Sequence, residues 1–328
     1  MVATFSIRMV AIAAGLAITA AVPTLTAQPG GAAADAGVRQ QAVGTAAQAA
    51  AVRYWTTSRM TRDLVRQPPP GTAPAWLSGD TRGAGLRWTH GGAVAAAVGR
   101  VFFTLGGADY VCSGALVGGP HPGVVLTAAH CVTGGPGRGG ATQWATNWVF
   151  VPGFAGGLLP YGEYTADSFL VSPAWTAPGG GEPDDFAFVQ VTAATLAAAA
   201  PHGLPPGLSV EFASGQDAGS QDTGSQDTGG LTRSYVFGYP AEPPYTGLYP
   251  AFCAGQVTAW ADSVRMPCGM TAGDSGGPWL VGFRPRSGSG LVAAVTTYKV
   301  SGDLAVLYGA VLGPQARALY QWAVRPAR

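Results

Sequence analysis

The chain has 328 residues, a formal net charge of +1 and only 11% charged residues. Its length allows one large hydrophobic core or two of medium size, and its nearly balanced, scattered charge gives no basis for a nucleic-acid partner. The 50 glycines and 26 prolines, together with short apolar runs at residues 101–105 and 292–295, predict a turn-rich, all-β protein.

The N-terminus predicts a secretory signal peptide over residues 1–27. Arg8 precedes an apolar stretch at residues 9–22, and residues 25–27 (LTA) fit a cleavage site. The stretch is short for a membrane span, and an uncleaved N-terminal anchor is the alternative interpretation. Because no later segment is long and apolar enough to span a membrane, we expect a secreted, extracellular protein without stable membrane association.

Residues 28–90 are rich in alanine, proline and glycine, which predicts a prosegment or a flexible N-terminal region. Within them, residues 47–65 favour a short helix that ends before the three prolines at 68–70.

Two β-rich blocks follow, at residues 91–213 and 231–328, each with short apolar runs between Gly/Pro turns. This texture predicts an antiparallel barrel or sandwich. Residues 214–230 (SGQDAGSQDTGSQDTGG) form a low-complexity repeat, which predicts a solvated loop between the two lobes, and their aspartates lack the spacing of a calcium loop. A C-terminal helix is expected after residues 313–314, with Ala316, Leu319, Tyr320 and Ala323 on one face.

The four cysteines fall into two pairs along the chain. In an exported protein they predict two disulfides, most simply Cys112–Cys131 and Cys253–Cys268. A zinc site is the competing interpretation, but the chain has no Cys-x-x-Cys pair and only four histidines. We therefore expect no metal.

Residues 273–278 (GDSGGP) are the most specific string in the chain. A serine hydroxyl attacks a carbonyl only when a base takes its proton and donors await the oxyanion, and flanking glycines let consecutive N–H groups point at one spot. Ser275 is therefore the candidate nucleophile. The string also fits the nucleophile elbow of α/β-hydrolases, which requires a histidine after the serine. All four histidines precede it: His90, His121, His130 and His202.

The order histidine, aspartate, serine is instead that of the chymotrypsin fold. His130 lies in residues 127–131 (TAAHC), directly after an apolar run and beside Cys131, whereas His121 and His202 are flanked by prolines as loop residues are. Two adjacent carboxylates, Asp184 and Asp185, begin the later run DDFAFV and are the candidates for the acid.

From about residue 99 to its end the chain resembles the chymotrypsin/trypsin-like serine peptidases, in particular secreted actinobacterial and glutamyl-endopeptidase-like members. The strings that carry the resemblance are YWTTSRM, GRVFFT, YVCSGALV, LTAAHCV, NWVFVPGF, DDFAFV, YVFGYP and CGMTAGDSGGPW. The resemblance implies two packed six-stranded antiparallel β-barrels with a short C-terminal helix, the first barrel carrying the histidine and aspartate and the second the serine.

The resemblance also implies the roles of the site residues. The family pattern (Asp, bulky apolar, Ala, bulky apolar) selects Asp185 over Asp184, completing a triad with His130 and Ser275. The backbone amides of Gly273 and Ser275 would form the oxyanion hole. The implied activity is hydrolysis of peptide bonds through an acyl-enzyme. We expect a monomer that takes protein or peptide substrates and needs no cofactor.

Three departures from the digestive members are visible. No Ile-Val-Gly-Gly-like start precedes Cys112, so activation by a new amino terminus beside Asp274 is not expected. A cysteine usual in the family is Thr271 here, and the specificity pocket would be built from Gly269, Met270 and Thr271, which carry no charge. A buried charge without a partner is costly, so uncharged substrate side chains are expected, unless Arg284 or Arg286 reaches the pocket.

Two alternatives to an endopeptidase remain at this point. One is a secreted binding protein that keeps the fold without catalysis, which would not react with a fluorophosphonate. The other is an esterase on the same fold, which would turn over simple esters in preference to peptides.

Overall fold

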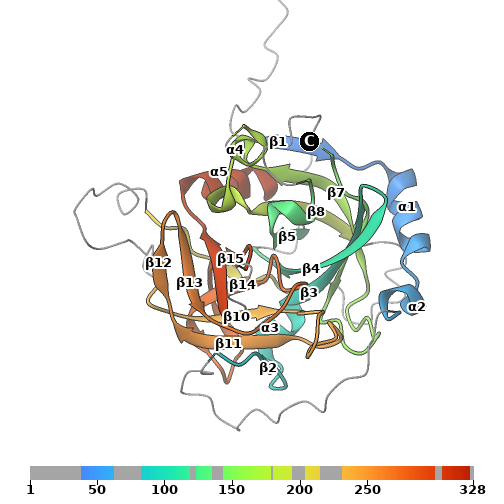
Figure 1. Ribbon diagram of the computed structural model, residues 1–328. Helices are drawn as coiled ribbons and strands as arrows, with labels where there is room; N and C mark the ends of the chain where they lie inside the picture. Colours follow the sequence, from blue (N-terminus) through green and yellow to red (C-terminus); the bar gives the residue numbers. More distant parts are fainter. Residues whose placement is uncertain are drawn as a thin grey trace, which may run out of the picture. The chain divides into compact units, whose positions relative to one another are not determined.

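Two β-sheets make up most of the computed structural model (Figure 1). It describes residues 38–62, 83–118, 123–134, 143–178, 180–193, 204–214, 231–299 and 305–325, all within the unit Gly37–Arg328. The predicted signal peptide (1–27) and the repeat at 215–230 lie outside the described residues.

The first sheet closes into a six-stranded antiparallel barrel. Its strands follow the order β7-β6-β3-β4-β5-β8, and β8 pairs back with β7, which closes the ring. Large apolar side chains on these strands are fully buried, including Phe102, Phe150 and Phe188. The six strands are β3 (Val98–Leu105), β4 (Ala108–Leu116), β5 (Gly123–Thr127), β6 (Thr146–Pro152), β7 (Tyr164–Val171) and β8 (Ala187–Ala193).

The second sheet curls in the same way but is joined differently at its seam. Its path is β12-β13-β16-β15-β14-β10-β11, and among the described strands β11 and β13 share no ladder, although they lie in contact. The Cys253–Cys268 disulfide links β11 to the residue after β13, so a covalent bond spans the seam. The strands are β10 (Arg233–Gly238), β11 (Ala251–Gln256), β12 (Thr258–Trp260), β13 (Ser263–Pro267), β14 (Pro278–Arg284), β15 (Ser289–Thr296) and β16 (Val306–Val311).

The chymotrypsin-like arrangement predicted from the sequence is therefore confirmed, with one difference: the second sheet has more than the six expected strands, and its strands β11 and β13 are joined by the disulfide instead of a backbone ladder.

The segment before the first barrel packs against it. Strand β1 (Arg39–Ala42) pairs with β7, and helices α1 (Thr45–Tyr54) and α2 (Thr57–Met60) lie along the outside of the barrel (Figure 1). Trp55, between the two helices, is 5% exposed, contacts Phe102 and donates its indole N–H to the Asn147 carbonyl. Residues 38–62, within the predicted prosegment or flexible region, thus pack against the barrel. The segment expected as one helix over 47–65 contains two helices, which end at Tyr54 and Met60.

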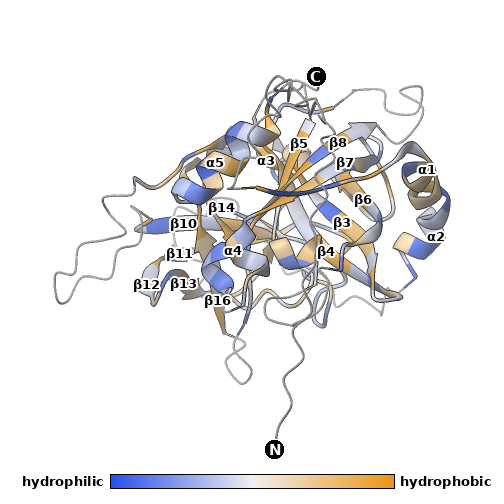
Figure 2. Cartoon of the chain, turned by 90° about the horizontal axis from the view of Figure 1, so that it is seen from above, coloured by the Kyte–Doolittle hydropathy of each residue, from blue (hydrophilic) through white to orange (hydrophobic). Residues whose placement is uncertain are grey.

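Several elements cross the domain boundaries that the sequence predicts. Strand β2 (Leu86–Arg87) pairs with β11, and β9 (Ser209–Val210) pairs in parallel with β15, so both belong to the second sheet. The C-terminal helix α5 (Pro314–Ala323) contacts β7 and β8 of the first barrel. Of the four residues predicted on its apolar face, Ala316, Leu319 and Ala323 are buried and Tyr320 is half-buried. Both hydrophobic and hydrophilic residues are visible along the helix in Figure 2. The remaining short helices are α3 (Gly92–Ala97), η1 (Ala129–Cys131), α4 (Pro173–Thr176) and η2 (Glu182–Asp184).

None of the helices in the described parts of the chain has the length and apolar character needed to cross a membrane.

Replacing both Cys253 and Cys268 by alanine is expected to lower the free energy of unfolding by about 3 kcal/mol, because the bond closes a loop whose ends are 15 residues apart. Denaturation in guanidinium without reductant measures the difference from the unaltered protein. Peptide mass mapping of the non-reduced protein is the companion experiment: pairing of either cysteine with Cys112 or Cys131 would contradict the arrangement.

Candidate active site

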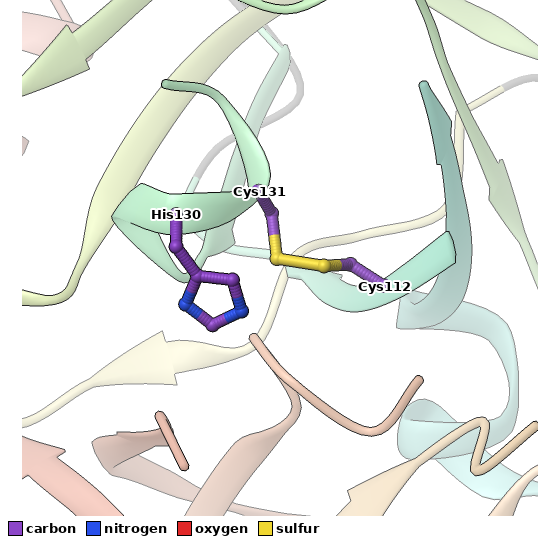
Figure 3. A group of neighbouring side chains, drawn as sticks. All are labelled: Cys112, His130 and Cys131. Atoms are coloured by element: carbon purple, nitrogen blue, oxygen red, sulfur yellow. A yellow bond between two sulfur atoms is a disulfide. The ribbon is translucent and has the colours of Figure 1, made fainter. Parts of the chain in front are cut away.

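A single turn of 3₁₀ helix holds His130. Strand β5 ends at Thr127, and η1 (Ala129–Cys131) begins two residues later. The Cys112–Cys131 disulfide ties this turn to β4, and Figure 3 shows the histidine ring beside the sulfur bridge. The neighbours Ala129 and Cys131 are fully buried, whereas the His130 side chain is 32% exposed. The imidazole ring is therefore accessible on a turn whose other residues are anchored in the core.

The carboxylate of Asp185 contacts His130 at two points. One carboxylate oxygen lies 2.8 Å from Nδ1 of His130, and the other accepts the backbone N–H of the same residue at 2.9 Å. A carboxylate at Nδ1 fixes the tautomer in which Nε2 is free to accept a proton. Asp185 is 2% exposed and directly follows η2, whose last residue is Asp184. Only Asp185 of the two adjacent carboxylates therefore contacts the histidine.

The charges around His130 favour its protonated form. Burial acts to lower the pKa of this histidine, but the charge of Asp185 and the hydrogen bond to it, together with the charge of Asp274, raise the pKa above the ordinary value of 6.5. The site thus stabilises an imidazolium once it forms.

The turn that carries Ser275 is shaped by two glycines in left-handed backbone conformations. Gly273 has φ +101° and Gly276 has φ +83°, a region that side-chain-bearing residues rarely adopt. A Cβ on Gly276 would also lie 2.3 Å from the Ser113 carbonyl and from the Thr127 hydroxyl, so no larger residue fits there. Ser275 is half-buried, while residues 273, 274, 276 and 277 are buried.

Ser113 on β4 fastens this turn to the first barrel. Its hydroxyl donates to the Gly273 carbonyl at 2.8 Å and accepts the Tyr239 N–H at 2.7 Å, and its N–H donates to the Ser275 carbonyl at 2.7 Å. The Ser113 carbonyl in turn accepts from the Thr127 hydroxyl at 2.7 Å. Four hydrogen bonds of one fully buried residue therefore join the nucleophile turn to the strand pair that leads to His130.

Asp274, next to Ser275, is buried in a different environment. Burial raises the pKa of its carboxyl to about 7, although the charges of Lys299 and His130 and a backbone hydrogen bond act in the opposite direction. Its Oδ2 has no hydrogen-bond partner among the described residues. The positive charge near Asp274 thus comes from a lysine side chain, in a chain where the sequence predicts no inserted amino terminus.

The three residues predicted to line a specificity pocket are held by backbone contacts. Gly269 donates its N–H to the Gly83 carbonyl at 2.7 Å, Met270 is fully buried, and the Thr271 hydroxyl bonds both backbone groups of Glu242. The ammonium of Lys299 donates to the Cys268 carbonyl at 2.7 Å, directly before Gly269. A positive charge therefore lies beside this segment, which reasoning from residues 269–271 alone missed.

Cys112, His130 and Cys131 bring their ligand-type atoms together within 4.8 Å (Figure 3). The two sulfur atoms are bonded to each other, so neither is a thiolate that could bind a metal ion.

Comparisons with known proteins were made on the sequence and on the fold. No family model matches the chain, and no curated protein matches its sequence. Among solved structures, the protease Anisep from Arthrobacter nicotinovorans is 30% identical, with a TM-score of 0.58 over 71% of this chain and 97% of that one. A thermostable serine protease from an extremophilic microorganism is 27% identical, with a TM-score of 0.58 over 71% of this chain and 98% of that one.

Replacing Ser113 by alanine is expected to lower the free energy of unfolding by about 2 kcal/mol or more, because it leaves the buried Gly273 carbonyl and Tyr239 N–H without their partner. Denaturant titration measures the loss. Ser287→Ala is the matched control, since that hydroxyl is exposed and bonds only Ser289 and the Arg284 carbonyl; equal losses in the two variants would refute the special role of Ser113.

Proposed function

The chain belongs to the chymotrypsin-like serine endopeptidases, and we propose that it hydrolyses peptide bonds with His130, Asp185 and Ser275 as its catalytic triad. The observation that carries the proposal is the pair of contacts from both Asp185 oxygens to His130, which leaves Nε2 free to act as the base. The next residue, Cys131, has its sulfur 3.9 Å from the Ser275 carbonyl, so the two turns are neighbours.

The mechanism is acyl transfer in two halves. His130 Nε2 takes the proton from Ser275 Oγ as this oxygen attacks the carbonyl carbon of the scissile bond, and then gives it to the leaving amine. A water molecule deprotonated by the same nitrogen breaks the resulting ester, and Ser275 Oγ regains its proton. Asp185 stays ionised and stabilises the imidazolium, consistent with the raised pKa of His130.

The oxyanion would be bound by the backbone N–H groups of Gly273 and Ser275. Two observations support this role: the left-handed conformation of Gly273, and the hydrogen bonds that Ser113 donates to the carbonyls of Gly273 and Ser275. These bonds fix the peptide group that follows each donor residue. One such donor is worth about 3 kcal/mol in the transition state.

The residue before the scissile bond would be read near Gly269, Met270 and Thr271. The expected exclusion of arginine and lysine there gains a reason, since the Lys299 ammonium at the Cys268 carbonyl would repel a second cation. The expectation of an uncharged substrate side chain assumed that residues 269–271 have no charged neighbour, whereas Lys299 lies beside them. Turnover of peptides with Ala, Leu, Phe, Glu or Arg before the scissile bond distinguishes a preference for uncharged side chains from one for acidic side chains.

We also propose that the enzyme is secreted and acts on extracellular proteins or peptides as a monomer. The two disulfides, Cys112–Cys131 and Cys253–Cys268, support export because such bonds persist in oxidising compartments.

The triad is tested by variants of its members. Ser275→Ala is expected to abolish covalent labelling by a fluorophosphonate and all peptide turnover, and Asp185→Asn to lower kcat by about 10⁴-fold through loss of the correct tautomer. Asp184→Asn is the matched control, because this carboxylate does not contact the histidine. Labelling of Ser275→Ala at another serine, or an equal loss in the two asparagine variants, would refute the assignment.

The pH dependence follows from His130. The base must be neutral, and its pKa is raised, so kcat/KM for peptide hydrolysis is expected to fall as the pH drops, with a midpoint above 6.5. A pH series with a neutral peptide substrate measures the midpoint in the free enzyme. A midpoint below 6.5 would mean that Asp185 and Asp274 do not stabilise the imidazolium.

A further inference from the structure

A cavity of about 490 Å³ opens beside the nucleophile turn. Three parts of the chain form it: the segment Trp55–Arg62 with helix α2, the strands β3 and β4, and the second-sheet residues around Glu242 and Gly273. The N-terminal segment thus reaches the edge of the proposed active site.

The cavity borders the proposed oxyanion hole but not the residues proposed to read the side chain before the scissile bond. It includes Gly273, the proposed oxyanion donor, but none of Gly269, Met270 and Thr271. A carbonyl bound at Gly273 with its own side chain near residues 269–271 must send the chain beyond the scissile bond the other way. A cavity that includes Gly273 without residues 269–271 is placed to receive that part of a substrate.

The walls of the cavity are fixed before any substrate arrives. The Ala241 N–H donates to the Ala272 carbonyl at 2.7 Å, and Glu242 is held through both backbone groups by the Thr271 hydroxyl. On the opposite side, Trp55 and Met60 are buried against the barrel. A preformed cavity lowers the entropic cost of ordering a ligand.

The charges at the rim favour an anion. Arg59 is half-buried and stacks its guanidinium on the Tyr54 ring, 3.9 Å from the centroid, and Arg62 is exposed. Within the described parts of the chain, no carboxylate lies within 4 Å of either guanidinium. The lining also holds two acids: Asp109, which accepts from the hydroxyls of Tyr54 and Thr104, and the exposed Glu242.

We propose that this cavity is the binding site for substrate residues that follow the scissile bond, and that Arg59 and Arg62 select an acidic side chain there. The proposal rests on the proposed function, and it requires that residues 54–62 remain in the mature enzyme. It makes part of the segment with prosegment-like composition a specificity element.

The test uses acyl transfer to added amines, which isolates this side of the site. An ester substrate acylates Ser275; the amine nitrogen of a dipeptide amide then attacks the acyl carbon, the bond to Ser275 Oγ breaks, and the amine's proton passes through His130 to that oxygen. The nucleophiles Ala-Glu-NH₂, Ala-Gln-NH₂ and Ala-Lys-NH₂ compete with water, and the ratio of amide to acid product measures how well each binds.

The full chain is expected to prefer the Glu nucleophile to the Lys nucleophile by about five- to tenfold, and the Arg59→Gln, Arg62→Gln double variant to lose most of this preference. Because the preference is a ratio within one variant, differences in the amount of active enzyme cancel. Arg53→Gln is the matched control: this arginine is exposed on α1 and does not line the cavity.

Three results would overturn the proposal. These are equal use of the three nucleophiles by the unaltered enzyme, the same loss of preference in Arg53→Gln, and removal of residues up to 62 from the active form as read by intact mass. Each leaves the triad standing if a fluorophosphonate still labels Ser275. An unlabelled Ser275 would refute the proposed function itself, and the cavity's role with it.

Discussion

The position of the nucleophile turn depends on the hydrogen bonds of one buried residue, Ser113. Residues 273–277 lie between β13 and β14 of the second sheet and are buried except for Ser275, and buried backbone groups need partners. Ser113 supplies two of these partners, its hydroxyl to the Gly273 carbonyl and its N–H to the Ser275 carbonyl, and its hydroxyl also accepts the N–H of Tyr239. Because it stands on β4 one residue after Cys112, the disulfide that positions His130 and the bonds that position Ser275 start from the same place in the first barrel. The relative geometry of base and nucleophile is thereby set by two adjacent residues of one strand.

The two buried aspartates of the site show how environment divides their roles. Asp185 spends both oxygens on His130, so its charge is matched by a specific partner. Asp274 leaves one oxygen without a partner among the described residues, and burial raises its pKa to about 7 in spite of Lys299. An acid with a raised pKa costs stability as the pH rises from its unfolded value of about 4 towards 7, because only the unfolded chain then ionises freely. The fold tolerates this cost next to Ser275, where the charge of Asp274 also favours the imidazolium of His130.

The sequence predicts those parts of the site that local backbone chemistry defines. The string GDSGGP carries its own conformational requirement, which Gly273 and Gly276 meet with positive φ, and the spacing of the cysteines is enough to suggest the pairing found. Ser113 and Lys299 could not be recognised in this way, because each acts through hydrogen bonds to backbone carbonyls of residues distant in the chain. Every residue has a backbone carbonyl, so the sequence does not show which of them will be the partner. The packing of residues 38–62 was missed for a related reason. An alanine-rich segment has little hydrophobic pattern of its own, and its order comes from Trp55 and Met60 entering a core built by later strands.

The N-terminal segment, residues 38–62, is attached to the first barrel by packing as well as by the chain. Burying Trp55 against Phe102 removes a large apolar area from water, and losing such a side chain from a core costs about 3–5 kcal/mol. Strand β1 adds a ladder along β7 on the same face of the barrel. A segment held by both contacts stays in place after any cut in the region outside the described residues, between 63 and 82, because removing the covalent link does not remove the packing. Cleavage there would therefore leave the wall formed by α2 beside Gly273, while cleavage before residue 38 would leave it covalently attached as well. Either route of maturation would keep Arg59 in the lining of the cavity.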